Sequence, residues 1–254
     1  MINLHSGNFL LNYKELEPNS FDLILTDPPY NCLEGIQKWD VQLDWELLEE
    51  VLSSLLKPNG QIIIFCNMPL FAKLHSTFSG KLKYKYSHFW EKQGMPVNPT
   101  MPIQEVEVIA LFKWKHGKHL TFNKDVLGEK GESYKKKNNI LNIPTRKMKK
   151  TEFSINSTGM RYPRSIIKAP SKPNMKKAER TNHPTQKPLS LIKKLIQGYS
   201  NPGDNVLDPF CGSGTTLLAC HDLDRSGVGY EIEEEFFNEA QMRIKSYTAQ
   251  LKLL

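Results

Sequence analysis

The chain has 254 residues, 39% of them hydrophobic, and a formal net charge of +7. This length suits one large α/β domain with an added lobe, or two small domains. No apolar run is long enough to cross a bilayer, and the start "MINLHSGNFL" lacks a signal-peptide pattern, so we expect a cytoplasmic protein. The four cysteines form no CxxC pair. We therefore expect reduced thiols rather than a disulfide framework or a zinc site.

The first 112 residues alternate between strand patterns and helical patterns. The continuous apolar run "QIIIFC" is typical of a strand that is covered on both faces of a parallel sheet. A helix is predicted behind a capping residue at Asp44, because leucine and valine recur with helical period between residues 47 and 55. Two more helices are expected over 9–16 and 69–78. The expected strands are residues 2–5, 21–26 and 61–66, followed by 84–91 and 105–112, which are close enough in sequence to pair antiparallel.

The pattern changes between residues 113 and 182, where the hydrophobic period disappears and no detailed structure is predicted. From Lys113 to Lys187 there are 20 Lys and Arg against 5 Asp and Glu, a local net charge of +15. The remainder has 14 against 22, a net charge of −8. A phosphate backbone would bind such an insert through counterion release, whereas the alternative is a solvated, partly disordered loop. The charge density favours contact with nucleic acid.

Regular patterns return after residue 182. Strands that alternate with helices indicate a mostly parallel sheet wrapped by helices on both faces. The predicted elements are a helix over 188–199, a strand over 205–208, a helix over 214–223, a strand over 227–232 and a last helix over 234–247.

A glycine-rich turn, "VLDPFCGSGTTLLAC" (206–220), joins one of these strands to a helix. Gly212 and Gly214 lack a Cβ atom, so the backbone can approach a ligand closely at a helix N-terminus. Glu231 ends the next strand, the place from which a carboxylate reaches the two hydroxyls of a ribose. Asp208 can hold a ligand ammonium group by a charge-assisted hydrogen bond. The spacing F-x-G-x-G is neither the dinucleotide fingerprint nor a Walker loop, and the alternative is a tight structural turn with an exposed glutamate.

The stretch "LILTDPPYN" (23–31) places an acid, two prolines and a tyrosine directly behind a buried strand. Ligands of open parallel sheets bind beyond the carboxyl ends of the strands, where Asp27 is expected. Its carboxylate can accept one hydrogen bond from an amino group, and the Pro28 carbonyl a second, because the Pro28-Pro29 pair is rigid. Tyr30 offers a face on which a planar base can stack. These groups describe a pocket for a nucleobase with an exocyclic amine; the alternative is a proline-rich turn with a surface acid and a core tyrosine.

Together these stretches resemble the S-adenosylmethionine-dependent amino-methyltransferases of DNA. "DPPY" (27–30) resembles the catalytic motif of the N6-adenine enzymes, and "DPFCGSG" (208–214) resembles the cofactor motif. "HPTQKP" (183–188) matches a segment that precedes the cofactor strand in one subgroup, and "GYEIEEEF" (229–236) matches the strand with the ribose acid. The order of the motifs resembles the beta group, a circular permutation of the common methyltransferase fold. The resemblance covers nearly the whole chain except 113–182.

The resemblance implies an α/β fold of the permuted, Rossmann-like methyltransferase type, with a mostly parallel central sheet, an antiparallel strand pair and a basic target-recognition insert. The strands over 21–26 and 205–208 would then be adjacent at the centre of the sheet, and the N-terminal strand would lie beside the strand that ends at Glu231. The implied parts are residues 1–112 as the catalytic half of the core, 113–182 as the basic DNA-recognition insert and 183–254 as the cofactor-binding half.

The resemblance also assigns roles to individual positions. Asn8 stands where family members often have an acid near the adenine amino group of the cofactor, and its amide oxygen can still accept that hydrogen bond. Lys187 is expected near the carboxylate of the cofactor, or else is a solvated lysine before a helix. No metal site is expected. The implied catalytic residues are Asp27, Pro28, Pro29 and Tyr30, and the implied cofactor-binding residues are Asn8, Asp208, Phe210, Gly212, Ser213, Gly214, Thr215, Glu231, Thr185 and Lys187.

The implied activity is transfer of a methyl group from S-adenosylmethionine to the N6 amino group of adenine in DNA, as in a bacterial or phage modification system. The target base would be flipped out of the duplex or already single-stranded. N4-cytosine methylation is the nearest alternative, although members with that activity usually carry serine where Asp27 stands. A catalytically inactive DNA-binding regulator is an alternative of another class. Partners in keeping with the resemblance are DNA, a second copy of the chain and a separate restriction endonuclease, with no membrane.

Overall fold

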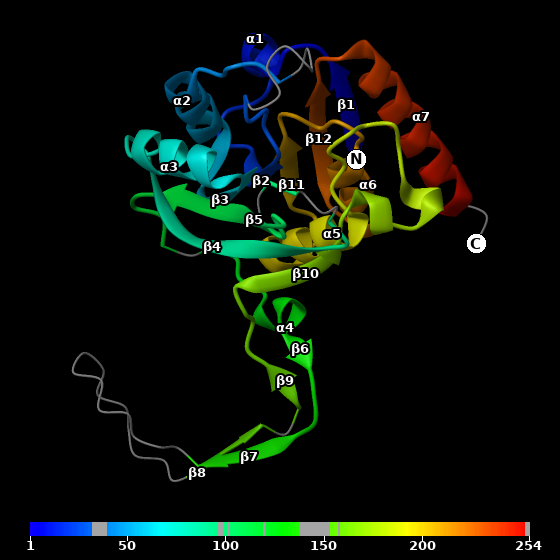
Figure 1. Cartoon of the computed structure of the whole chain (residues 1–254). Helices are drawn as coiled ribbons and strands as arrows, with labels where there is room; N and C mark the ends of the chain where they lie inside the picture. Colours follow the sequence, from blue (N-terminus) through cyan, green and yellow to red (C-terminus); the bar gives the residue numbers. More distant parts are fainter. Residues whose placement is uncertain are drawn as a thin grey trace.

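The computed structural model describes residues 1–31, 40–95, 99–100, 102–118, 120–137, 153–156 and 158–251. A central sheet with helices on both faces forms the body, and a narrow arm extends from it (Figure 1). The strands of the central sheet are β1 (Ile2–Ser6), β2 (Phe21–Thr26), β3 (Leu56–Cys66), β4 (Leu82–Gln93), β5 (Val106–Trp114), β10 (Ile166–Pro170), β11 (Asn205–Asp208) and β12 (Ser226–Glu231).

The order of strands in this sheet is β1-β12-β11-β2-β3-β5-β4-β10. In the part β1-β12-β11-β2-β3 of this order, each strand pairs in parallel with the next. β4 also pairs in parallel with β10. β5 runs antiparallel to both of its neighbours, β3 and β4. A mostly parallel sheet that contains one reversed strand confirms the predicted fold class. The two expected adjacencies, β2 beside β11 and β1 beside β12, are also present.

Helices cover the two faces of the sheet and divide its hydrophobic core in two. One buried cluster holds residues of α1, α2 and α3 against β2, β3 and β5, and the other holds residues of α5 and α6 against the opposite face. α7 packs beside α6, β1 and β12. The helices are α1 (Phe9–Asn12), α2 (Trp45–Leu55), α3 (Met68–Thr77), α5 (Leu189–Tyr199), α6 (Thr215–Asp222) and α7 (Glu234–Leu251). The helix expected over 9–16 is divided into α1 and a 3-10 turn, η1 (Tyr13–Glu15).

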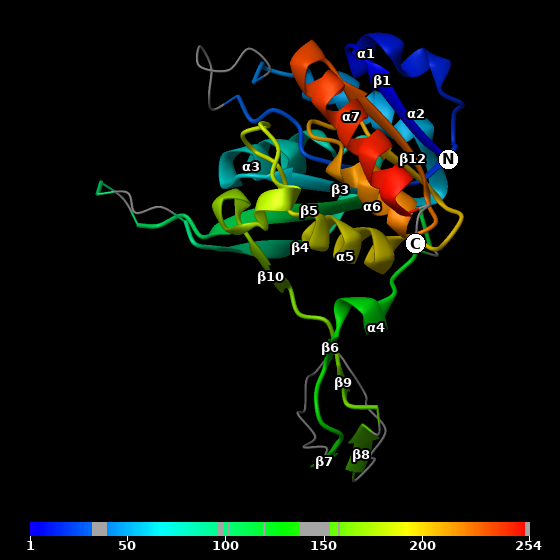
Figure 2. The same cartoon turned by 90° about the vertical axis from the view of Figure 1, so that its right-hand side faces the viewer.

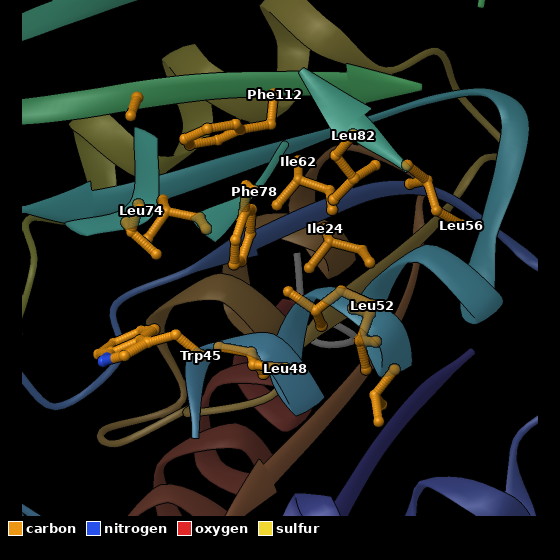
Figure 3. Packing of buried hydrophobic residues seen from close by; sticks show 14 of the residues in the cluster. Ile24, Trp45, Leu48, Leu52, Leu56, Ile62, Leu74, Phe78, Leu82 and Phe112 are labelled. Carbon is orange, nitrogen blue, oxygen red and sulfur yellow. The ribbon is translucent and has the colours of Figure 1, made fainter. Parts of the chain in front are cut away.

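The helix α2 shows how the sequence pattern becomes packing. The Asp44 carboxylate caps its N-terminus by accepting hydrogen bonds from the backbone N–H groups of Glu46 (3.1 Å) and Leu47 (3.0 Å). Leu48 and Leu52 are fully buried and lie in the same cluster as Ile24 and Ile62 of the sheet, as Figure 3 shows. This apolar stripe holds the helix against one face of the central sheet.

Part of the basic insert forms an arm made of short elements, which are α4 and β6 to β9 (Figure 2). β6 (Glu129–Lys130) pairs with β9 (Met160–Arg161), and β7 (Tyr134–Lys137) pairs with β8 (Phe153–Asn156), both antiparallel. The helix α4 (Lys124–Leu127) lies at the base of the arm. Two-stranded ribbons bury little apolar surface, which explains why the hydrophobic period gave no signal here. The arm's basic segment over 138–152 lies outside the described residues.

Residues that follow the arm return to the body. β10 pairs with β4 at the edge of the central sheet, so residues 166–170 belong to the core although they fall within the basic stretch. Two 3-10 turns come next, η2 (Lys172–Asn174) and η3 (Lys177–Glu179), and lead to α5. Among the described helices, none is long and apolar enough to cross a bilayer.

Replacing Leu48 with alanine is expected to lower the free energy of unfolding by about 2–5 kcal/mol, because the side chain is fully buried. The neighbouring Leu47 is 38% exposed, and its replacement by alanine should change stability by no more than about 0.5 kcal/mol. Urea unfolding of the two variants measures both values. Equal losses would contradict the burial of this helix face.

Candidate functional site

Two turns meet at the centre of the sheet because their strands are paired. β2 and β11 run in parallel, with Leu23 opposite Val206 and Ile24 opposite Leu207. The DPPY turn after β2 and the glycine-rich turn after β11 therefore emerge side by side. Both line one cavity of about 380 Å³, within the range of roughly 300–1,000 Å³ that is usual for small-molecule sites. Every residue predicted for the site lines this cavity, with the exception of Gly214.

The carboxylate of Asp27 lies in one half of the cavity and has two partners. The Tyr30 hydroxyl donates a hydrogen bond to Oδ1 at 2.7 Å, and the Lys187 ammonium pairs with Oδ2. Burial raises the pKa of Asp27, and the charge of Lys187 opposes that rise without cancelling it. Burial also raises the pKa of Tyr30 well above its ordinary value, so its hydroxyl stays protonated and donates. Pro28 and Pro29 are buried in the same wall.

A second carboxylate, Glu107, faces the same half of the cavity and was not predicted from the sequence. It lies near the start of β5, with its side chain 8% exposed. Glu107 accepts a hydrogen bond from the Tyr30 hydroxyl at 3.0 Å and pairs with Lys187 at 3.2 Å and Lys92 at 2.5 Å. Burial would raise the pKa of Glu107, but the two ammonium groups outweigh it and lower the pKa. The available signal was an acid inside the otherwise apolar run "VEVIALF" (106–112).

Lys187 is buried in the cavity wall, so it is not the solvated lysine of the alternative interpretation. Its ammonium is held between Asp27 and Glu107, 5.1 Å from the centre of the Phe65 ring. Burial lowers the pKa of Lys187, but the two carboxylates raise it by more, so the group stays charged. The DPPY half of the cavity thus contains a buried cluster of two acids, two lysines and a tyrosine.

The glycine-rich turn forms the other half. Gly212 and Gly214 have φ angles of +51° and +73°, in the left-handed region that favours glycine. A Cβ atom at Gly212 would lie 2.9 Å from the His183 ring, and one at Gly214 would lie 3.2 Å from Ala240. Gly214 is the N-cap residue of α6 and is packed against α7 behind the cavity wall. The two glycines therefore serve close packing of the turn, and Gly212 also borders the cavity.

Two acids flank this turn, and both are oriented by backbone groups. Glu231 accepts hydrogen bonds from the N–H groups of Gly212 (2.8 Å) and Glu233 (2.9 Å), and its burial raises its pKa. Asp208 accepts from the Phe210 N–H at 3.2 Å and from the Thr216 hydroxyl at 2.6 Å. Burial raises the pKa of Asp208 to about 6. A carboxylate offers about four acceptor positions, so each acid keeps acceptor capacity for a ligand.

The remaining predicted residues border the glycine-rich half. Asn8 caps α1 by accepting a hydrogen bond from the Leu10 N–H at 2.9 Å, which fixes its amide at the cavity wall. Thr185 is exposed at the rim. Within the described ranges, no group of three or more His, Cys, Asp or Glu side chains is placed to hold a metal ion.

Arg243 of α7 connects the glycine-rich turn to the segment that returns from the arm. Like Glu107, this residue was not predicted from the sequence. Its guanidinium donates to the Ser213 carbonyl at 2.8 Å, to the Thr215 hydroxyl at 2.9 Å and to the Glu179 carbonyl at 3.4 Å. Nothing in the sequence marks this arginine, because it sits in an ordinary amphipathic helix pattern.

The two halves differ in what they can bind. The glycine-rich half offers close backbone, buried acids and the Phe210 ring, which fit a ligand with a ribose and an amino group. The DPPY half offers carboxylate oxygen and an aromatic ring, which fit a planar base with an exocyclic amine. A methyl donor in the first half and an amine in the second would lie in one cavity.

The chain resembles known proteins over almost its whole length. The sequence model of a family described as DNA methylase matches residues 21–242. The type II methyltransferase M.HpaI of Haemophilus parainfluenzae is 32% identical over 251 residues, which covers 94% of this chain and 73% of that protein. The DNA adenine methyltransferase YhdJ of Escherichia coli (strain K12) is 30% identical over 250 residues, covering 94% and 81%. A crystal structure of the M1.HpyAVI–SAM complex is 28% identical, covers 96% of this chain and 99% of that chain, and has a TM-score of 0.68.

The raised pKa of Asp208 predicts a specific pH dependence of stability. Its folded pKa is about 6, whereas an unperturbed aspartate has a pKa of about 3.9. The folded state therefore binds more protons than the unfolded chain between about pH 4 and pH 6, and stability from this group is lost as the pH rises through that window. The difference in free energy of unfolding between wild type and Asp208→Asn should fall by about 3 kcal/mol at most from pH 4 to pH 6. Above pH 6 this difference should stay constant. Urea unfolding of both proteins from pH 4 to pH 7 measures the difference, and a constant difference would contradict the assignment.

Proposed function

This chain belongs to the DNA methylase family and is an S-adenosylmethionine-dependent DNA methyltransferase, and we propose that its target is the N6 amino group of adenine. The observation that supports this target is the Asp27 carboxylate, which shares a cavity with the glycine-rich turn. N4-cytosine methylation remains the alternative, and an acid rather than serine at this position favours adenine. The intact acid and the intact glycine-rich turn argue against an inactive regulator.

The exocyclic amine of a base is a poor nucleophile, because its lone pair is delocalised into the ring. We assign Asp27 and the Pro28 carbonyl as acceptors of its two N–H hydrogen bonds, which favours a pyramidal nitrogen and stabilises the positive charge that develops on it. Tyr30 provides the ring on which the base stacks, while its hydroxyl orients Asp27. S-adenosylmethionine supplies an electrophilic methyl group when it is bound.

The glycine-rich half is assigned to the cofactor. Glu231 is oriented to accept hydrogen bonds from the ribose hydroxyls, and the backbone at Gly212 and Ser213 borders the same space. Asp208 is assigned to the cofactor ammonium, and the Phe210 ring to packing against the cofactor. Asn8 and Thr185 would complete the wall. Gly214 acts indirectly, by allowing α6 to start close to α7.

We assign DNA binding to the arm. The basic stretch is attached to a body of opposite net charge, so phosphate groups would be attracted to this side of the molecule. Of the three parts inferred from the sequence, 1–112 and 183–254 would form the core and 113–182 the recognition insert. Because β10 pairs within the central sheet, we place the DNA-contacting portion before residue 166.

A cellular role follows from the relatives. M.HpaI carries the name of a type II methyltransferase. We propose that this chain likewise protects DNA in the cytoplasm of a bacterium, as part of a restriction-modification system with a separate endonuclease. A homodimer is compatible with this role.

The target is tested by incubating the protein with S-adenosylmethionine and mixed DNA and by identifying the modified nucleoside by mass spectrometry. We expect N6-methyladenine from the wild-type protein. Asp27→Ala should lower the rate by at least about 100-fold, because a transition-state acceptor is lost. Calorimetry should show unchanged cofactor affinity in this variant. N4-methylcytosine would identify the alternative enzyme, and bound cofactor without any methylated nucleoside would identify the regulator.

The role of the arm is tested by the salt dependence of DNA binding. Each phosphate contact contributes about 0.9 to the slope of log K against log salt concentration. Replacing Lys135–Lys137 of β7 with glutamine should reduce that slope by about 1 to 3. A matched control replaces Lys14, Lys73 and Lys245, which are exposed on the core, and should leave the slope unchanged. Equal salt slopes for wild type and the arm variant would show that these lysines of the arm do not contact DNA phosphates.

A further inference from the structure

The Lys187 ammonium occupies an oxygen that the proposed reaction needs. It pairs with Oδ2 of Asp27, while the Tyr30 hydroxyl takes Oδ1. Asp27 keeps further acceptor positions, so an amine that enters the pocket would bind the same carboxylate beside this cation. The arrangement becomes unfavourable as positive charge develops on the amine, because two like charges would then lie against one acid.

Glu107 offers this ammonium a second place. Its Oε1 is already 3.2 Å from Lys187 Nζ, so a small displacement of the lysine lengthens one ion pair and tightens the other. Glu107 is itself held from two sides, by Lys92 on Oε2 and by the Tyr30 hydroxyl on Oε1. A carboxylate fixed in this way can receive the ammonium without a rotamer change. The Phe65 ring lies near the ammonium and bounds the space in which it moves.

We propose that Glu107 is a positioning residue that draws Lys187 away from Asp27 when the target amine enters, so that the amine and the ammonium do not share one carboxylate while positive charge develops on the amine. This inference rests on the proposed assignment of Asp27 to the amine. It gives a reason for a buried, charged network beside the DPPY turn: two acids share one mobile cation, and the substrate decides which acid holds it. Glu107 does not touch the amine in this scheme.

The charges around Asp27 determine how a variant at Glu107 should behave. The groups that face Asp27 come from every surrounding element: Lys187 from the segment before α5, Glu107 from β5, Tyr30 from its own turn, Cys66 from β3 and Asp208 from β11. Lys92 of β4 acts through Glu107. Glu107 raises the pKa of Asp27 and Lys187 lowers it. If Glu107 lost its charge, its repulsion of Asp27 would disappear and Lys187 would no longer be shared with Glu107, and both changes would lower the pKa of Asp27.

The test compares Glu107→Gln with wild type over a pH series of kcat/KM. The amine needs an ionised Asp27, so activity is lost as the pH falls through the pKa of that acid. We expect the plateau of Glu107→Gln to fall at least about tenfold, and its acidic limb to move to lower pH. A purely structural role would lower the plateau without moving the limb. A limb that coincides with wild type, or lies at higher pH, would overturn the proposal.

Two control variants, a double-mutant comparison and an NMR titration complete the design. Glu107→Asp keeps the charge and should restore the wild-type limb. Glu49→Gln removes another buried carboxylate, which accepts hydrogen bonds from the backbone N–H groups of Lys81 and Leu82 where α2 contacts β4. This variant should be less stable but should keep the acidic limb of the pH profile at the wild-type position. In a Lys187→Met background, Glu107→Gln should cost less than it does alone, because its proposed partner is already absent. Equal costs in both backgrounds would count against the proposal.

Carbon-13 NMR can follow the titration of the Asp27 carboxyl without turnover, and the Asp27→Asn variant identifies its signal. The pH midpoint of this titration should be lower in Glu107→Gln than in wild type. An unchanged midpoint would overturn the proposal even in a protein that shows no transfer. The proposed function fails by a different result, since the identity of the methylated nucleoside is read from the wild-type protein alone.

Discussion

The parallel pairing of β2 with β11 is the constraint on which the site depends. These strands are far apart in the chain, yet their backbone hydrogen bonds place two carboxyl ends next to each other. Each end carries one turn, and neither turn alone encloses a cavity. The helices on both faces bury the apolar runs of the strands and so hold this pairing in register. Two binding halves with different chemistry thereby share a single space.

Burial sets the electrostatics of that space. In water, Asp27, Glu107, Lys92 and Lys187 would be independent charges, but inside the cavity each is costly unless it is paired. The cluster balances two acids with two lysines, and the pKa directions follow from the pairing. Such a balanced cluster is also sensitive to any group that enters it. In the proposed reaction, an amine bound at Asp27 would change the charge balance and so link substrate binding to the position of Lys187.

The arm and the body divide the work of a DNA enzyme between different physical principles. The body relies on a large apolar core, which positions reacting groups closely. The arm has short ribbons and a high positive charge, and the DNA contact proposed for it would require little buried surface. Arg243 and the turns after β10 connect the two, because the arginine bonds both the glycine-rich turn and the Glu179 carbonyl.

The sequence by itself determined the body's elements, the cavity's two turns and the family. Apolar runs and helical periods depend only on local pattern, and they located β2, β11 and the capped start of α2. Motif residues such as Asp27 and Glu231 were recognisable because their positions at strand ends are encoded nearby. Tertiary structure alone decided the partners of Lys187, the presence of Glu107 in the cavity and the contact of Arg243 with the turn. These contacts join segments separated by 28 to 160 positions, and a long side chain can reach several places, so only the packed fold selects among them.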